Sequence, residues 1–133
     1  LADADDFHSD EAKAKMAAGH PLTDADRAPW LQRIAEWLRS QPEGCVLACS
    51  ALKRSYRDVL RTGSDNLCFL HLAGDPAVVT ERVGHRMHHY MPASLVQSQY
   101  AALEPLEPDE FGVSLDFTLG PELIVEKFLK EVQ

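Results

Sequence analysis

The chain has 133 residues, of which 45% are hydrophobic and 26% charged, so it is long enough to form one packed domain. Its formal net charge of −8 argues against a nucleic-acid-binding surface, because such surfaces are usually basic. No apolar run approaches the roughly 18 residues of a membrane span and no signal peptide is recognisable, so the sequence predicts a cytoplasmic protein without nucleic-acid or membrane partners.

The first five residues read as the end of a β-strand that delivers Asp3 and Asp5 to the carboxyl edge of a sheet. A helix is predicted over 23–40, because Thr23 can cap its first turn and apolar residues then return at helical spacing. Acidic side chains in a first turn are stabilised by the helix dipole. We expect only that structural role for Asp24.

Strands and helices alternate along the rest of the chain. Three short apolar runs predict β-strands, at 45–50, 67–73 and 111–117. The first is apolar on both faces, which is typical of a buried parallel strand. Helical patterns lie between and after them, at 50–63 with Ser50 as the cap, 76–86, 92–103 and 121–132. The last helix is expected to present one apolar stripe to the core: Leu123, Ile124, Phe128, Leu129 and Val132. This alternation predicts an α/β fold, a parallel sheet with helices on both faces, in which ligands bind beyond the carboxyl ends of the strands.

Four stretches of this sequence closely resemble the gluconokinases, small P-loop kinases of the nucleoside-monophosphate and shikimate kinase type. They are DADDFH (3–8), KMAAGHPLTDADRAPWL (15–31), ACSALKRSYRDVLR (48–61) and SLVQSQYAALEP (94–105). The resemblance implies a P-loop NTPase fold and transfer of the γ-phosphate of ATP, with Mg²⁺, to the 6-hydroxyl of D-gluconate to give 6-phosphogluconate. A homodimer is the family expectation.

One part of the family pattern has no counterpart. The family begins with a strand, a G-x-x-x-x-G-K-[ST] phosphate loop and a helix, and the glycines of this sequence show no such spacing. Roughly the first thirty residues of the pattern are therefore missing, including the loop that cradles the nucleotide phosphates. We expect a single kinase domain over 1–133, shortened at its N-terminus relative to the family, that binds ATP poorly or not at all by itself.

The resemblance assigns roles to the first acidic cluster. Asp3 would lie near the magnesium ion, and Asp5 would hold the sugar-acid hydroxyl and accept its proton. Because alternate residues of a strand point in opposite directions, the two aspartates can serve two sites. The residues alone also allow a solvated turn and helix start. His8 matches the family pattern as a substrate-binding residue, although a helix-capping role fits this position equally well.

Arg27 is the predicted ligand of the substrate carboxylate. A planar guanidinium beside an apolar proline–tryptophan corner is a good bidentate clamp for a carboxylate. We expect His20 and Trp30 to shape the pocket, with Arg57 as the rival clamp.

Three polar residues follow the 45–50 strand at helical spacing, Ser50, Lys53 and Arg57, so they can face one cleft. Lys53 can neutralise the substrate or the transferring phosphate, and Ser50 can bind substrate. The alternative is an exposed basic helix face, which we accept for Arg54 and Arg61.

Segment 81–92 is expected to be the lid. Arg82 and Arg86 lie one helical turn apart and are assigned to stabilising charge on the transferring group, Arg82 also to binding the nucleotide. His85, His88 and His89 allow a metal-binding interpretation, which is weak because no carboxylate or cysteine nearby completes a site.

By analogy with the fold, the loop from Asp116 to Pro121 would meet the adenine. Two alternatives to gluconokinase activity remain open: a catalytically inactive fragment that binds sugar acids, and a kinase of the same fold that acts on another polyol acid.

Overall fold

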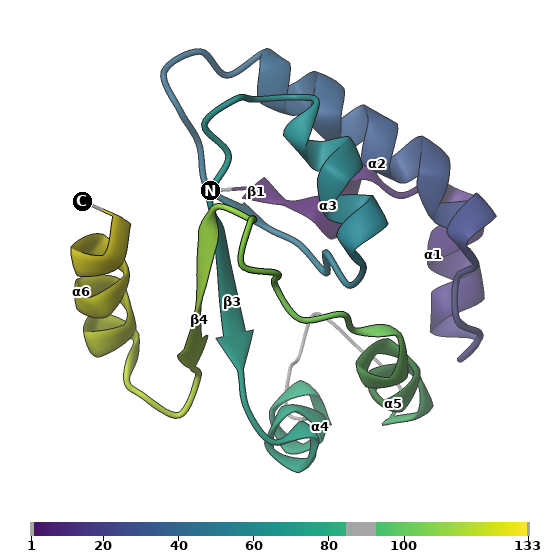
Figure 1. Ribbon diagram of the computed structural model, residues 1–133. Coiled ribbons are helices and arrows are strands. Elements are labelled where there is room, and N and C mark those ends of the chain that lie inside the picture. The colour runs from purple at the N-terminus through teal and green to yellow at the C-terminus, as the bar shows by residue number, and fades with distance from the viewer. Residues whose placement is uncertain (1, 85–92, 133) are drawn as a thin grey trace.

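The computed structural model describes residues 2–84 and 93–132. The elements in chain order are β1 (Ala2–Asp3), a 3-10 helix η1 (Ala4–Phe7), α1 (Asp10–Ala17), α2 (Asp24–Arg39), β2 (Leu47–Ala48), α3 (Arg54–Arg61), β3 (Phe69–Ala73), α4 (Pro76–Gly84), α5 (Ala93–Ala102), β4 (Gly112–Asp116) and α6 (Pro121–Val132) (Figure 1). The predictions for Arg86 and for the three lid histidines lie outside the described residues.

The strands form two parallel pairs, β1 with β2 and β3 with β4. Helices connect the paired strands, as parallel pairing requires, so the predicted α/β class is confirmed. The described residues do not, however, join these pairs into one continuous sheet. The expected burial of 45–50 on both faces is also wrong, because Val46 is 66% exposed. Leu47 and Cys49 pack on the core beneath α2 and α3, and the alternate residues point away from it.

The core lies where α2 and α3 pack on η1 and β1. Its largest fully buried side chains are Trp30, Ile34 and Leu60. Helix α2 begins as predicted, since Thr23 Oγ1 accepts a hydrogen bond from the Asp26 amide (3.1 Å) and Asp26 Oδ2 accepts one from the Thr23 amide (2.8 Å). Both ends of this helix agree with the sequence prediction.

Helix α3 begins later than predicted. Its N-cap is Lys53 rather than Ser50, and the Arg54 amide donates to Glu104 Oε1 at 3.0 Å. The carbonyl of Leu52 accepts a hydrogen bond from the Glu104 amide at 2.6 Å. This distant segment thus satisfies the backbone groups on which an earlier helical turn would depend.

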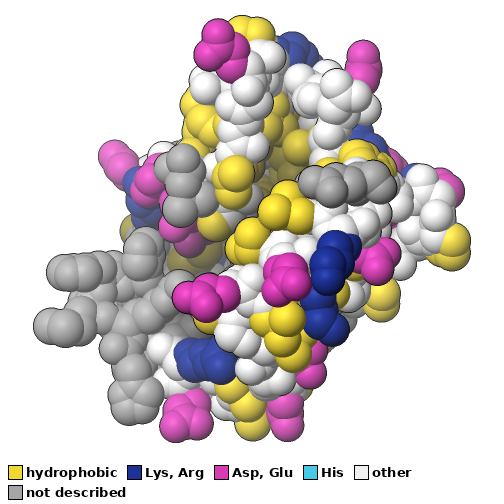
Figure 2. Space-filling model, turned by 90° about the vertical axis from the view of Figure 1, so that its left-hand side faces the viewer, with side chains coloured by type: hydrophobic (Ala, Val, Ile, Leu, Met, Phe, Trp, Pro, Cys, Tyr) yellow, Lys and Arg dark blue, Asp and Glu magenta, His cyan; other side chains and the backbone are white. Residues whose placement is uncertain are grey.

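Helix α6 covers one side of the β3–β4 pair (Figure 1). The predicted stripe is only partly correct, because Ile124 is buried but Leu123 and Leu129 are 40% and 47% exposed. A groove of about 620 Å³ lies beside this helix, and its lining is mainly apolar: Leu70, Leu72, Arg82, Phe117, Ile124 and Val125 contribute to it. Figure 2, which faces the α6 side, shows hydrophobic side chains exposed among charged ones. No helix in the described part of the chain is long and apolar enough to cross a membrane.

Candidate active site

Four polar side chains meet where α2 and α3 begin. We call Asp24, Arg27, Lys53 and Tyr56 the Tyr56 cluster. The Tyr56 hydroxyl donates a hydrogen bond to Asp24 Oδ1, and Lys53 Nζ lies 3.0 Å from the same oxygen and 3.3 Å from Oδ2. Arg27 Nη1 donates to the Tyr56 hydroxyl at 3.2 Å. Two cationic side chains and a phenol, all from the first turns of α2 and α3, therefore gather around one carboxylate, an arrangement suited to binding an anion.

The charges of the cluster support one another. The hydrogen bond from Tyr56, followed by that from Lys53, lowers the pKa of Asp24. The hydrogen bond to Asp24 raises the pKa of Lys53. Burial, together with the bond to Asp24, raises the pKa of the Tyr56 phenol. At neutral pH the cluster thus contains a carboxylate, an ammonium and a protonated phenol. The guanidinium of Arg27 and the ammonium of Lys53 lie 5.5 Å and 5.7 Å from the centre of the Tyr56 ring, within the range of cation–π interactions.

Arg27 retains donors that a ligand can use. Its Nη1 binds the Leu22 carbonyl (2.9 Å) and the Tyr56 hydroxyl. Among the described residues, Nε and Nη2 donate no hydrogen bond. The residue is half-buried, so the guanidinium is held in place while part of it stays accessible. The arrangement fits the predicted clamp, which stays a prediction.

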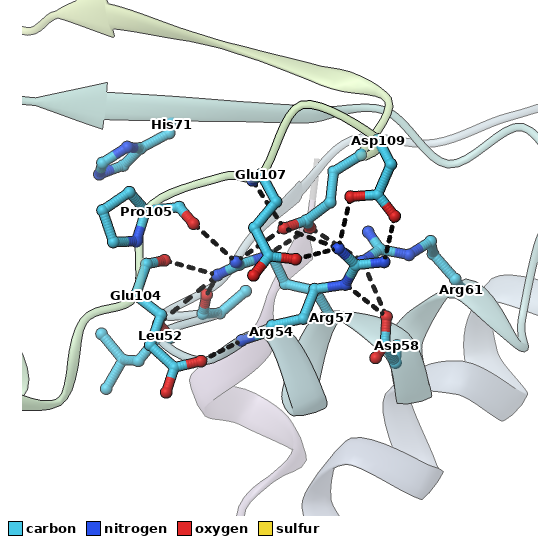
Figure 3. Close-up of polar contacts among 12 residues, drawn as sticks. Leu52, Arg54, Arg57, Asp58, Arg61, His71, Glu104, Pro105, Glu107 and Asp109 are labelled. Atoms are coloured by element: carbon cyan, nitrogen blue, oxygen red, sulfur yellow. Dashed lines mark hydrogen bonds and ion pairs between the residues drawn. The ribbon is translucent and has the colours of Figure 1, made fainter.

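Arg57, the rival clamp, has no such freedom. It is 2% exposed and forms a bidentate pair with Glu110, at 2.7 Å from Nε to Oε2 and 2.9 Å from Nη2 to Oε1. Its remaining donors reach four backbone carbonyls (Figure 3), those of Ala51, Leu52, Glu104 and Pro105. Because all its N–H groups are used inside the protein, Arg57 ties the start of α3 to the 104–110 segment and cannot grip a substrate in this structure.

The expected basic face of α3 is an ion-pair network (Figure 3). Arg54 contacts Asp58, Glu107 and Asp109. Arg61 contacts Asp58 and Glu110, each at 2.9 Å or less. Acidic residues of 104–110 therefore neutralise this face, and it is not free to bind phosphate.

Asp3 and Asp5 lie on different elements. Asp3 ends β1 and caps η1, and its Oδ1 accepts a hydrogen bond from the Asp5 amide at 2.9 Å. Asp5 stands on the 3-10 turn, so the alternation along a strand that we predicted for the two is wrong. The local cap explains the difference, because an aspartate two residues before a free amide favours a turn over a continued strand.

His8 is buried against Trp30. The two rings stack with centroids 4.4 Å apart and an interplanar angle of 11°. Burial, and next the positive charge of Arg27, lower the pKa of His8 to about 4, so the imidazole is neutral near pH 7. Its Nε2 lies 3.9 Å from Asp5 Oδ1, and its buried Nδ1 has no partner among the described residues. Capping of the next helix is performed by Ser9, whose Oγ accepts from the Ala12 amide at 3.2 Å.

Trp30 anchors the 4–8 segment to helix α2. Its Nε1 donates to the Ala4 carbonyl at 2.7 Å, and the side chain is only 2% exposed. The predicted contact between Trp30 and a substrate is therefore not available in this structure. Trp30 instead holds the Ala4 carbonyl before Asp5 and the His8 ring after it.

The other predicted residues lie apart from this site or serve the backbone. The residues Ser50 and His20 are exposed, and no contact connects either with the Tyr56 cluster in the described part of the chain. Arg82 lies over the Phe117 ring, 5.1 Å from its centroid, so it does meet the predicted adenine loop. Asp116 shapes that loop, because its Oδ1 accepts from the Thr118 amide (2.8 Å) and hydroxyl (2.7 Å).

Sequence reasoning missed the polar roles of Asp24 and Tyr56. Tyr56 lies on the apolar face of α3, and its ring is indeed buried. The available signal was the spacing of Lys53 and Tyr56, which puts both on one side of the first turn. Nothing local connects them with Asp24, which lies 32 residues before Tyr56.

No family model matches the chain. Among curated proteins, it is 40% identical to a gluconokinase of Gluconobacter oxydans (strain 621H) over 134 residues, covering 98% of this chain and 75% of that protein. It is 42% identical to a thermosensitive gluconokinase of Escherichia coli (strain K12), covering 81% of this chain and 59% of that protein.

Solved structures agree. An unliganded sugar kinase from Janibacter sp. HTCC2649 superposes with a TM-score of 0.89 at 50% identity, covering 96% of this chain and 76% of that one. A gluconokinase from Sinorhizobium meliloti 1021 gives 0.85 at 43% identity, covering 98% and 74%.

Proposed function

Because the chain belongs to the gluconokinase family, we propose that it transfers the γ-phosphate of ATP to the 6-hydroxyl of D-gluconate. The observation that carries the proposal is the position of the Tyr56 cluster beside the Asp5 segment. Helix α2 holds both, since Arg27 belongs to the cluster and Trp30 anchors Ala4 and His8 one turn later. Arg27 is also near enough to His8 to lower its pKa. The same helix therefore contacts both the cationic cluster and the segment that carries Asp5, which would suit a substrate with an acid at one end and a hydroxyl at the other.

In this proposal the cluster binds the acid end of the substrate. Arg27 and Lys53 hold the gluconate carboxylate, and Asp5 orients the 6-hydroxyl and accepts its proton during transfer. Asp5 suits this role because its backbone is fixed by the Asp3 cap and its side chain remains half exposed, at 50%. Neutral His8 packs beside it without adding a competing positive charge.

ATP and Mg²⁺ are the partners that kinase chemistry implies. Magnesium is commonly bound through one or two protein carboxylates together with phosphate oxygens and water. Asp3 would hold it. When bound, the ion neutralises phosphate charge. Arg82 and residues 117–121 line one groove and, with Asp116 beside it in the chain, are the proposed nucleotide contacts.

The test combines binding with turnover. Isothermal titration of the purified chain with D-gluconate should give saturable binding. Gluconate-dependent ADP production in a coupled assay with ATP and Mg²⁺, at roughly 1 to 100 per second, would rule out an inactive sugar-acid-binding module. Binding without turnover would favour a sugar-acid-binding module instead. Equal responses to a panel of other polyol acids would contradict gluconate as the substrate. The cytoplasmic location stays a prediction from the sequence, and the homodimer stays a prediction of the family resemblance.

A further inference from the structure

Asp24 lies against Lys53 and Tyr56, at the place in the Tyr56 cluster that the proposed function assigns to the substrate carboxylate. Lys53 contacts both oxygens of its carboxylate, and the Tyr56 hydroxyl donates to Oδ1. Arg27 reaches the same place through the Tyr56 hydroxyl. In this structure Lys53 and Tyr56, two of the groups that would recognise an acid, are thus engaged by a carboxylate that belongs to the protein.

Asp24 is also the member of the cluster that can leave most easily. Its side chain is 66% exposed, whereas that of Lys53 is 29% exposed and Tyr56 is 3% exposed. It is not needed to start α2, because Thr23 and Asp26 form the capping box. Rotation of Asp24 into solvent would therefore leave both the helix and the remaining donors in place.

We propose that Asp24 is an internal substitute for the substrate carboxylate, and that a sugar acid binds by displacing it from Lys53 and Tyr56. Tyr56 is then a further substrate-binding residue, which donates its hydroxyl to the incoming acid. This inference rests on the proposed function and adds to it a step of competition inside the site. Two carboxylates cannot share these donors without like-charge repulsion, so the exchange is exclusive.

The exchange gives the site a means of discrimination. An acid restores the charge balance that is lost when Asp24 leaves, whereas a neutral polyol does not. The neutral compound would have to separate Lys53 from its only anionic partner among the described residues of the cluster without replacing it. Specificity for acids then arises partly from the penalty imposed on neutral sugars.

The experiment is titration calorimetry of D-gluconate and of D-glucitol, its neutral counterpart, into the wild-type chain and Asp24→Asn. The substitution keeps the shape and removes the charge. Gluconate should bind Asp24→Asn roughly threefold to tenfold more tightly, because apparent affinity scales with the fraction of molecules whose site is open. Affinity for D-glucitol should rise at least as much, because the substitution removes the penalty of separating Lys53 from Asp24. Tyr56→Phe should weaken gluconate binding.

A matched control is Glu36→Gln, which removes one negative charge from an exposed position on the same helix and should not change gluconate affinity. Asp24→Ala serves as a second variant and should change affinity in the same direction as Asp24→Asn. Unchanged or weaker gluconate binding in both Asp24 variants would overturn the inference. The absence of gluconate binding from the wild type and both variants would also overturn it, because Lys53 and Tyr56 should bind an acid once the Asp24 carboxylate is removed.

Failure of the proposed function looks different. If Asp24→Asn tightens gluconate binding but the coupled assay shows no gluconate-dependent ATP consumption, the acid-binding site stands and the kinase assignment falls. If ATP consumption is present and the Asp24 variants bind gluconate no better, only the displacement of Asp24 is refuted.

Discussion

Glu110→Gln should destabilise the protein severely, because it leaves the buried Arg57 guanidinium without its anion. The Glu110 side chain is fully buried and receives two charge-assisted bonds from Arg57, a third from Arg61 at 2.8 Å, and the Glu107 amide at 3.0 Å. Removing one partner of a buried ion pair costs about 3–5 kcal/mol. Glutamine keeps one acceptor oxygen but turns the second into an amide that faces a donor.

The assay is urea denaturation followed by tryptophan fluorescence, since Trp30 lies in the core. The control is Asp109→Asn, which removes a carboxylate that is 69% exposed and also pairs with an arginine. An exposed pair of this kind contributes about 0–1 kcal/mol. The loss of unfolding free energy should therefore be several fold larger for Glu110→Gln than for Asp109→Asn. A loss for Glu110→Gln no larger than that for Asp109→Asn would refute the reasoning.

Should Glu110→Gln fail to fold, the double variant Arg57→Met/Glu110→Leu tests the same claim. Replacing both buried charges by apolar groups is often close to neutral, so this variant should regain much of the lost stability. It should also still bind gluconate. Loss of gluconate binding from a folded double variant would restore Arg57 as a candidate ligand.

Three further predictions concern other positions. Arg27→Lys should raise the gluconate Kd by about tenfold or more, because a lost charge-assisted bond is worth about 1.5–3 kcal/mol; unchanged calorimetric affinity would contradict the clamp. His8 takes up a proton more readily in the unfolded chain (pKa 6.5) than in the folded protein (pKa about 4). The contribution of His8 to the free energy of unfolding is therefore fully present above pH 6.5 and is lost on acidification. Urea denaturation should show a loss of about 2 kcal/mol between pH 7.5 and 5 that is absent from His8→Gln, and equal losses would argue against a buried neutral imidazole. Gly63→Ala should lower the free energy of unfolding by about 1–3 kcal/mol, because the added Cβ would lie 2.5 Å from the Ala35 carbonyl oxygen. Gly120→Ala, with no atom within 4 Å of the added Cβ, is the control, and a similar loss there would point to glycine flexibility instead of the clash.

Local signals in the sequence were sufficient for much of the fold. Thr23 and Asp26 stand three residues apart, and the capping box they form places the start of α2 correctly. The apolar runs around 69–73 and 112–116 identified the paired strands β3 and β4. The family motifs likewise extend over neighbouring residues, so the kinase class could be recognised before any contact was known.

Local signals in the sequence could not predict which charged side chains pair with one another. Arg27 and Arg57 look alike as candidate clamps in the sequence, yet one keeps free donors and the other is saturated by Glu110, 53 residues away. Asp24 satisfies the rule for a first-turn acid and also accepts from Tyr56, 32 residues away. The sequence by itself determined the family, the extent of α2 and the strands β3 and β4, because caps, periodicity and motifs act within a few residues. Only the tertiary structure decided which charged side chains pair within the protein and which keep donors for a ligand, because those pairings depend on how α2, α3 and the 104–110 segment pack.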